Sequence, residues 1–189
     1  MPKLVATPIR RETIMQSAER IRNLTRGLPI EEVARKMEII LTCFDDPEIK
    51  IGGYAYVTST EEPLFVDSLA RDGGIVRVLG ASKQYPHRAI VINRGYGLSD
   101  AEVFWHEFYH LFFSPESRDV STDFRHVFST EGALHAQEER RANEFAAAIL
   151  IEHIESDVII EDLMCQYCVS RRVAEIRVAQ SAATRNGNL

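Results

Sequence analysis

The stretch His-Glu-Phe-Tyr-His, residues 106–110, constrains this chain more than any other segment. It lies within the run SDAEVFWHEFYHLFF, where mostly aromatic and aliphatic side chains surround it. Polar groups in such a setting need partners, because an unpaired buried polar group costs free energy. On a helix, residues four apart share one face, so His106 and His110 lie together and the Glu107 carboxylate falls in the same arc. The pattern predicts two metal-ligating histidines beside a carboxylate that can reach a water molecule at the metal, and the alternative is a hydrogen-bonded pair of core histidines.

The helix that carries this motif has recognisable ends. Ser99 and Glu102 form a capping box, in which the serine side chain accepts from the Glu102 amide and the glutamate reaches back. The residue before a proline disfavours helical geometry, and Pro115 follows Ser114. We therefore expect a helix from about Asp100 to Phe113.

A catalytic zinc site needs a third protein ligand and an open position. The longer pattern that supplies a third histidine on the same segment fails here. Phe113 stands where it requires glycine, and Glu116 stands where it requires histidine. The third ligand must come from another element.

The best source of that ligand is the helix expected over residues 136–152. Glu139 shares a helical stripe with alanines that would allow close packing against the histidine helix. Asn143, one turn later, is placed to take a hydrogen bond from a ligating histidine. Glu138 is the rival ligand, but it lies 100° from the alanine stripe, so helical geometry favours Glu139.

The remaining sequence predicts an α+β fold in one domain over residues 1–189. We expect helices over residues 8–42, the first capped at Thr7-Pro8 and the second opened by Pro29, and more helices over 157–182. Between them lie β-rich runs divided by turn residues, which predict a small antiparallel sheet packed on the H-E-x-x-H helix. These runs cover residues 49–59, 64–69, 74–80 and 88–93.

Composition and charge narrow the class of protein. The 189 residues have 45% hydrophobic content and a formal net charge of −6, which argues against direct nucleic-acid binding. Three cysteines do not suggest a disulfide framework, and neither a signal peptide nor a membrane-spanning run is recognisable. We therefore expect a cytoplasmic protein.

Three segments together resemble the ImmA/IrrE family of zinc metallopeptidases. They are RAIVINRGYGLSDAEVFWHEFYHLFF, then EERRANEFAAAILI, then IIEDLMCQYCVSRRVAEIRV, within residues 88–178. The second segment is the specific one, because ERRANEFAA matches the family pattern E-x-x-A-N-x-F-A-A position for position. The core motifs fall within residues 88–152.

The resemblance implies a zincin-like fold and a zinc endopeptidase. It implies His106, His110 and Glu139 as zinc ligands and Glu107 as general base, which agrees with the geometric reasoning. The implied substrate is a helix-turn-helix transcriptional repressor, cleaved in a stress or mobile-element response. The alternative is a regulatory module that keeps the zinc fold and acts by binding a partner protein; peptide deformylase is a weaker one, because its Gly-Cys-Leu context is absent.

Some residues depart from the family pattern or suggest other chemistry. Trp105 and Tyr109 are bulky where the family is often small, so they could alter helix packing or the substrate cleft. Cys165 and Cys168 form a single C-x-x-C without a second pair, which favours packing or incidental residues over a redox or zinc site. His126 and His135, between the two motif helices, are expected at the surface, and the alternative for either is to stabilise an oxyanion.

Overall fold

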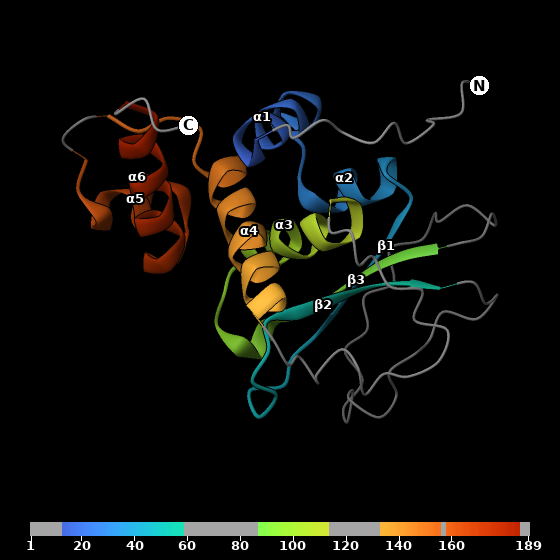
Figure 1. Cartoon of the computed structure of the whole chain (residues 1–189). Coiled ribbons are helices and arrows are strands. Elements are labelled where there is room, and N and C mark those ends of the chain that lie inside the picture. Colours follow the sequence, from blue (N-terminus) through green and yellow to red (C-terminus); the bar gives the residue numbers. More distant parts are fainter. Residues whose placement is uncertain (1–12, 59–86, 114–132, 156–157, 186–189) are drawn as a thin grey trace, which may run out of the picture.

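A computed structural model describes residues 13–58, 87–113, 133–155 and 158–185, and it shows the predicted α+β character (Figure 1). Its elements in chain order are α1 (Ile14–Thr25), α2 (Ile30–Lys36), β1 (Ile39–Phe44), β2 (Gly53–Thr58), β3 (His87–Asn93), the 3-10 turn η1 (Arg94–Tyr96), α3 (Asp100–Phe112), α4 (Ala133–Leu150), α5 (Ile160–Tyr167) and α6 (Arg171–Arg185). In the described parts of the chain, no helix is both long and apolar enough to cross a membrane.

The three described strands form a mixed sheet in the order β1-β3-β2. β2 pairs with β3 in the antiparallel sense, but β1 pairs with β3 in parallel, so the prediction of an antiparallel sheet is wrong for β1. Alternate residues of β3 enter two different cores: Ile90 and Ile92 face the helices, whereas Ala89 and Val91 join a smaller cluster on the other face. The expected strands over residues 64–69 and 74–80 lie outside the described residues.

The N-terminal helices are shorter than predicted. Thr13 caps α1 in a capping box with Gln16, so the helix begins at Ile14; the expected cap at Thr7-Pro8 lies outside the described residues. The second helix begins after Pro29 but ends at Lys36, and Glu38 adopts a left-handed conformation with φ of 56°. Residues 39–44 are therefore strand β1, and the expectation of helices throughout residues 8–42 is wrong there.

Helix α3 packs closely on the sheet because strand β2 has a glycine, Gly53, at the point of contact. A Cβ atom at Gly53 would lie 2.4 Å from Val103 Cγ1 and 2.5 Å from the Val91 carbonyl oxygen. Only a residue without a side chain allows this approach. The close packing brings strand β2 against the helix that carries the H-E-x-x-H motif.

Asn93, at the end of β3, organises the loop before β2. Its side chain is fully buried, and Nδ2 donates toward the carbonyl oxygens of Asp46, Ile49 and Ile51 at 2.9, 3.1 and 3.1 Å. Its Oδ1 accepts from the backbone amides of Asp46 and Gly95 at 3.1 and 3.0 Å. One amide side chain thus satisfies backbone groups in the loop between β1 and β2 and in η1, which leads into α3.

We expect Asn93→Ala to lower the free energy of unfolding by at least about 2 kcal/mol, because buried backbone groups would lose their partners. Urea denaturation followed by circular dichroism measures the effect. Asn23→Ala, at an exposed position of α1, is the matched control and should change stability by less than about 0.5 kcal/mol. Equal stability of the two variants would show that the Asn93 network does not hold the loop.

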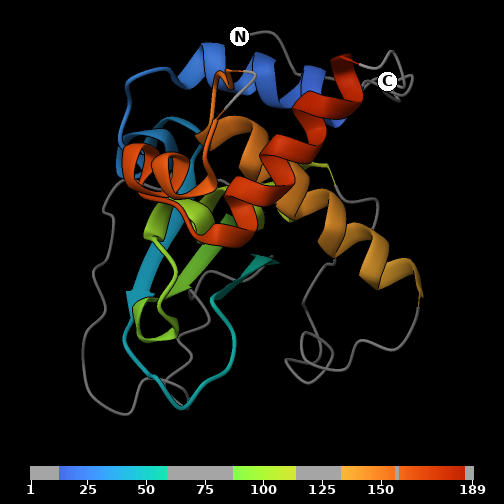
Figure 2. The ribbon, with the colours of Figure 1, turned by 90° about the vertical axis from the view of Figure 1, so that its left-hand side faces the viewer.

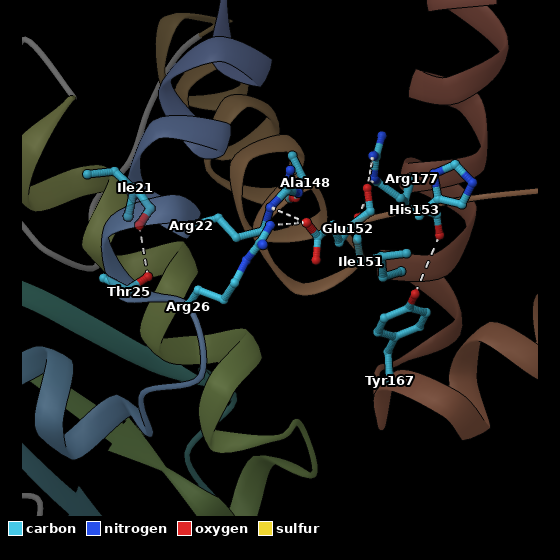
Figure 3. A network of polar contacts seen from close by, with 10 residues as sticks. All are labelled: Ile21, Arg22, Thr25, Arg26, Ala148, Ile151, Glu152, His153, Tyr167 and Arg177. Carbon is cyan, nitrogen blue, oxygen red and sulfur yellow. Dashed lines mark hydrogen bonds and ion pairs between the residues drawn. The ribbon is translucent and has the colours of Figure 1, made fainter.

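The C-terminal end of α4 is held by arginines from two other helices (Figure 3). From α1, Arg22 Nη1 donates to the Ala148 carbonyl oxygen at 2.9 Å. From α6, buried Arg177 donates to the carbonyl oxygens of Ile151 and Glu152 at 2.7 and 3.1 Å. Cations suit this end of a helix, where carbonyl groups lack helical partners. These contacts fix the orientation of the helix that supplies Glu139.

Helices α5 and α6 follow α4, and α6 crosses α4 obliquely (Figure 2). The two C-terminal helices were predicted over residues 157–182, and they occupy Ile160–Tyr167 and Arg171–Arg185. The predicted capping box of α3 is confirmed, and its Glu102 carboxylate has a further partner: Oε1 accepts from the Ser170 amide at 2.7 Å. The start of the histidine helix is thus tied to the start of α6.

Candidate metal centre

His106 and His110 from α3 meet Glu139 from α4 in one cluster. Glu139 Oε2 lies 3.1 Å from His106 Nε2, and Glu139 Oε1 lies 3.1 Å from His110 Nε2. The two Nε2 atoms are 3.2 Å apart. One nitrogen or oxygen from each residue lies within 4.8 Å of the others, so these side chains could hold a metal ion. The structure therefore brings the three predicted ligands together.

Small side chains allow the two helices to approach closely enough for this cluster. Ala142 and Ala146 of α4 are buried in the main core, on the stripe that also carries Glu139 and Asn143. Phe145 stacks on Phe108 of α3 with the ring planes 3° from parallel. Close contact on the alanine side and aromatic packing beside it set the spacing of α3 and α4.

Asn143 sets the chemical role of the His106 ring. Its Nδ2 donates to the Glu139 carbonyl oxygen at 2.7 Å, which turns its Oδ1 toward His106 Nδ1 at 3.2 Å. A carbonyl-type oxygen can only accept, so the ring donates from Nδ1 and keeps the Nε2 lone pair for a metal. This is the hydrogen bond that the sequence predicted.

With zinc as the probe ion, we expect Asn143→Ala to weaken metal binding at this cluster about 10- to 100-fold, because the ring loses the acceptor that orients it. Asn143→Asp keeps an acceptor and should retain most of the affinity. Gln137→Ala, at an exposed position of the same helix, controls for general effects on α4. Competition with a chromophoric chelator measures all three; an affinity of Asn143→Ala equal to that of the control would remove this role.

Glu138, the rival third ligand, is engaged elsewhere. Its Oε1 accepts from Arg141 Nη1 at 2.7 Å, and its Oε2 accepts from the Tyr109 hydroxyl at 3.4 Å. The cluster that could hold a metal contains Glu139 and not Glu138. The geometry therefore favours Glu139 as the third ligand, as its position on the alanine stripe also does.

Glu107 lies beside this cluster as a buried carboxyl group. Only 8% of the residue is exposed, and burial raises the pKa of its carboxyl group, although the charges of His106 and His110 oppose that shift. The Ala55 backbone amide of β2 also donates a hydrogen bond to it and lowers its pKa. A raised pKa suits a group that must both take and release a proton near neutral pH. The Ala55 amide left no signal in the sequence, because it depends on how β2 packs against α3.

The ligand cluster carries opposite charges in the absence of metal. Burial lowers the pKa of His106, but the hydrogen bond and charge of Glu139, together with the charge of Glu107, raise it above its ordinary value. Burial raises the pKa of Glu139, but hydrogen bonds and charges from both histidines hold it well below its ordinary range. The contribution of His106 to stability is complete below pH 6.5 and falls as the pH rises, whereas that of Glu139 is complete above pH 4.5 and falls as the pH drops. The metal-free cluster is therefore most stabilising between these values.

The same shift predicts how metal binding depends on pH. A metal ion must displace the proton of His106, so we expect zinc affinity to increase with pH, by up to about tenfold per unit, until His106 is neutral. Chelator competition from about pH 6 to about pH 8, corrected for the chelator's own protonation, measures this slope. An affinity that stays constant over this range would contradict the role of His106 as a ligand.

Tyr109 and Trp105, the two bulky residues in and beside the H-E-x-x-H motif, are buried in the main core. The Tyr109 ring packs against Phe113 and Phe145. Burial and the neighbouring Glu138 charge raise the pKa of Tyr109 to about 12, so its hydroxyl remains a neutral donor. Both residues shape helix packing in this structure.

The other candidate residues either lie away from the metal cluster or have side chains outside the part of the chain that the structure describes. Cys165 and Cys168 are exposed free thiols at the end of α5. His126 lies outside the described residues. His135 belongs to α4 rather than to a linker, and its side chain is not among those described.

No family model, curated protein or solved structure matches this chain.

Proposed function

We propose that this chain is a zinc endopeptidase of the ImmA/IrrE type with a zincin-like fold. The observation that carries the proposal is the convergence of His106, His110 and Glu139 from two helices, with Glu107 buried beside them. Two imidazoles and one carboxylate are a ligand set of catalytic zinc sites, which leave a position for water or substrate. Hydrogen-bonded core histidines would not require a carboxylate that faces both rings.

The chain's own residues would divide the work as follows. His106, His110 and Glu139 would hold the ion, and zinc there would supply a Lewis acid that acidifies water and polarises a peptide carbonyl. Glu107 takes the proton from the attacking water and transfers it to the leaving amine. Asn143 keeps the His106 ring in the orientation that ligation requires.

The proposed substrate is a helix-turn-helix transcriptional regulator, as the resemblance implies. The test is to incubate the zinc-loaded protein with a regulator encoded beside its own gene and to analyse the products by mass spectrometry. We expect cleavage at one position, and we expect a chelator to prevent it. A stable complex with the regulator that yields no fragments would instead support the regulatory binding module.

A further inference from the structure

A cleft of about 780 Å³ lies between helices α1, α4 and α6. Figure 2 shows α6 crossing α4, and a hydrogen bond of 2.8 Å from Gln180 Nε2 of α6 to the Glu144 carbonyl oxygen of α4 joins the two helices. This volume is within the range of about 300–1,000 Å³ typical of ligand-binding pockets. The residues that line the cleft include Met15, Glu139, Asn143, Ile176, Ala179 and Ala183.

The cleft is continuous with the metal centre. Glu139, whose side chain is 37% exposed, lines the cleft and also contacts both histidines. Asn143 lines it as well and contacts His106. A molecule in the cleft would therefore lie against the third metal ligand and its neighbour.

The lining of the cleft is mostly apolar, and the charged side chains at its rim include equal numbers of cations and anions. Ile14 and Met15 from α1 pack against the main core. Ile176 from α6 packs against a second hydrophobic cluster, which the end of α4 forms with α5 and α6. The cleft therefore lies along the boundary between these two clusters. At the rim, α4 contributes Arg140 and Glu144, which form an ion pair at 2.8 Å.

From α6, the rim also receives Arg172 and Glu175. Two cations and two anions thus border the cleft at its rim, and the third carboxylate of the lining, Glu139, faces the two histidines. This balance disfavours a strongly charged ligand such as a nucleic acid or a polyanion. It suits a neutral chain segment with apolar side chains.

We propose that this cleft binds a segment of the polypeptide substrate next to the cleavage site and accepts one of its large apolar side chains. The inference rests on the proposed peptidase function and adds a substrate preference to it. Ala179 and Ala183 on α6 keep the cleft open, because larger side chains there would occupy the space that the substrate needs.

The test uses the zinc-loaded full chain, a random-sequence peptide library and mass spectrometry of the products. Wild type should prefer a large apolar residue at one fixed position relative to the cut. We expect Ala179→Trp to lower kcat/KM for such peptides at least about tenfold. Ala179→Glu, also at an exposed helical position, should shift the preference toward Lys or Arg.

Ala182 provides the matched control, because it is an exposed alanine of the same helix that does not line the cleft. Ala182→Trp and Ala182→Glu should keep the wild-type preference, and all variants should keep wild-type zinc content. If wild type cleaves and the Ala179 variants keep its preference, the cleft assignment is wrong while the peptidase function stands. If zinc-loaded wild type cleaves neither a peptide nor a candidate regulator, the peptidase function and the cleft assignment are both wrong.

Discussion

Glu107→Gln is expected to lower kcat for peptide hydrolysis at least about 100-fold while the protein keeps its zinc. Glutamine preserves the shape of the side chain but cannot accept the proton of the attacking water. The residue is buried beside the histidines without belonging to the group that could hold the metal, so the substitution should separate catalysis from metal binding. Single-turnover cleavage of the regulator substrate, with zinc measured in the same samples, tests this expectation.

Glu19→Gln provides the control for loss of one carboxylate, because Glu19 is exposed on α1. It should match wild type in both measurements. If Glu107→Gln cleaves at the wild-type rate, Glu107 is not the general base. If it loses zinc instead, the residue supports the metal site and its role in proton transfer would have to be assigned to another group.

The second large effect concerns the third ligand. Glu139→Ala should weaken zinc binding more than about 100-fold, beyond the range typical of residues that only orient a ligand. Glu138→Ala should keep zinc, because Glu138 accepts hydrogen bonds from Tyr109 and Arg141. Zinc analysis after dialysis against a weak chelator compares the two variants with wild type.

These neighbouring glutamates make the comparison sharp, because both substitutions remove the same charge from adjacent positions of one helix. Loss of zinc from both variants would indicate a general electrostatic effect or a disturbed helix. Loss from the Glu138 variant alone would make that residue the ligand and would contradict the geometry of the cluster.

The arrangement of His106, His110 and Glu139 could be predicted because its signals lie within single helices. The Ser99 capping box and the Ser114-Pro115 pair bracket the histidine helix, and α3 ends at Phe112, one residue before the predicted end. Helical periodicity also placed Glu139 and Asn143 on the alanine stripe of α4. Two helices with defined faces leave few ways to complete a metal site.

The fold was harder to predict where distant segments decide it. The run EEVARKMEII keeps a helical pattern, but Glu38 adopts a positive φ and Ile39 begins a strand. That strand exists because it pairs in parallel with β3, almost 50 residues later, and periodicity alone cannot reveal such a pairing.

Asn93 and Glu102 illustrate the same limit for polar residues. The sequence around each residue predicts a local role: Asn93 as a turn residue and Glu102 as part of a helix cap. In the structure, Asn93 also binds a loop more than 40 residues earlier, and Glu102 also binds the Ser170 amide, 68 residues later. Their full roles depend on tertiary contacts that one-dimensional patterns do not contain.

X-ray absorption spectroscopy at the zinc edge of the loaded protein tests the metal centre most directly. The geometry predicts a first shell of nitrogen and oxygen only, with two imidazoles, at about 2.0–2.2 Å. A sulfur shell at about 2.3 Å would place the ion at Cys165 and Cys168 instead. Such a shell, or a spectrum with fewer than two imidazoles, would contradict the assignment of His106, His110 and Glu139.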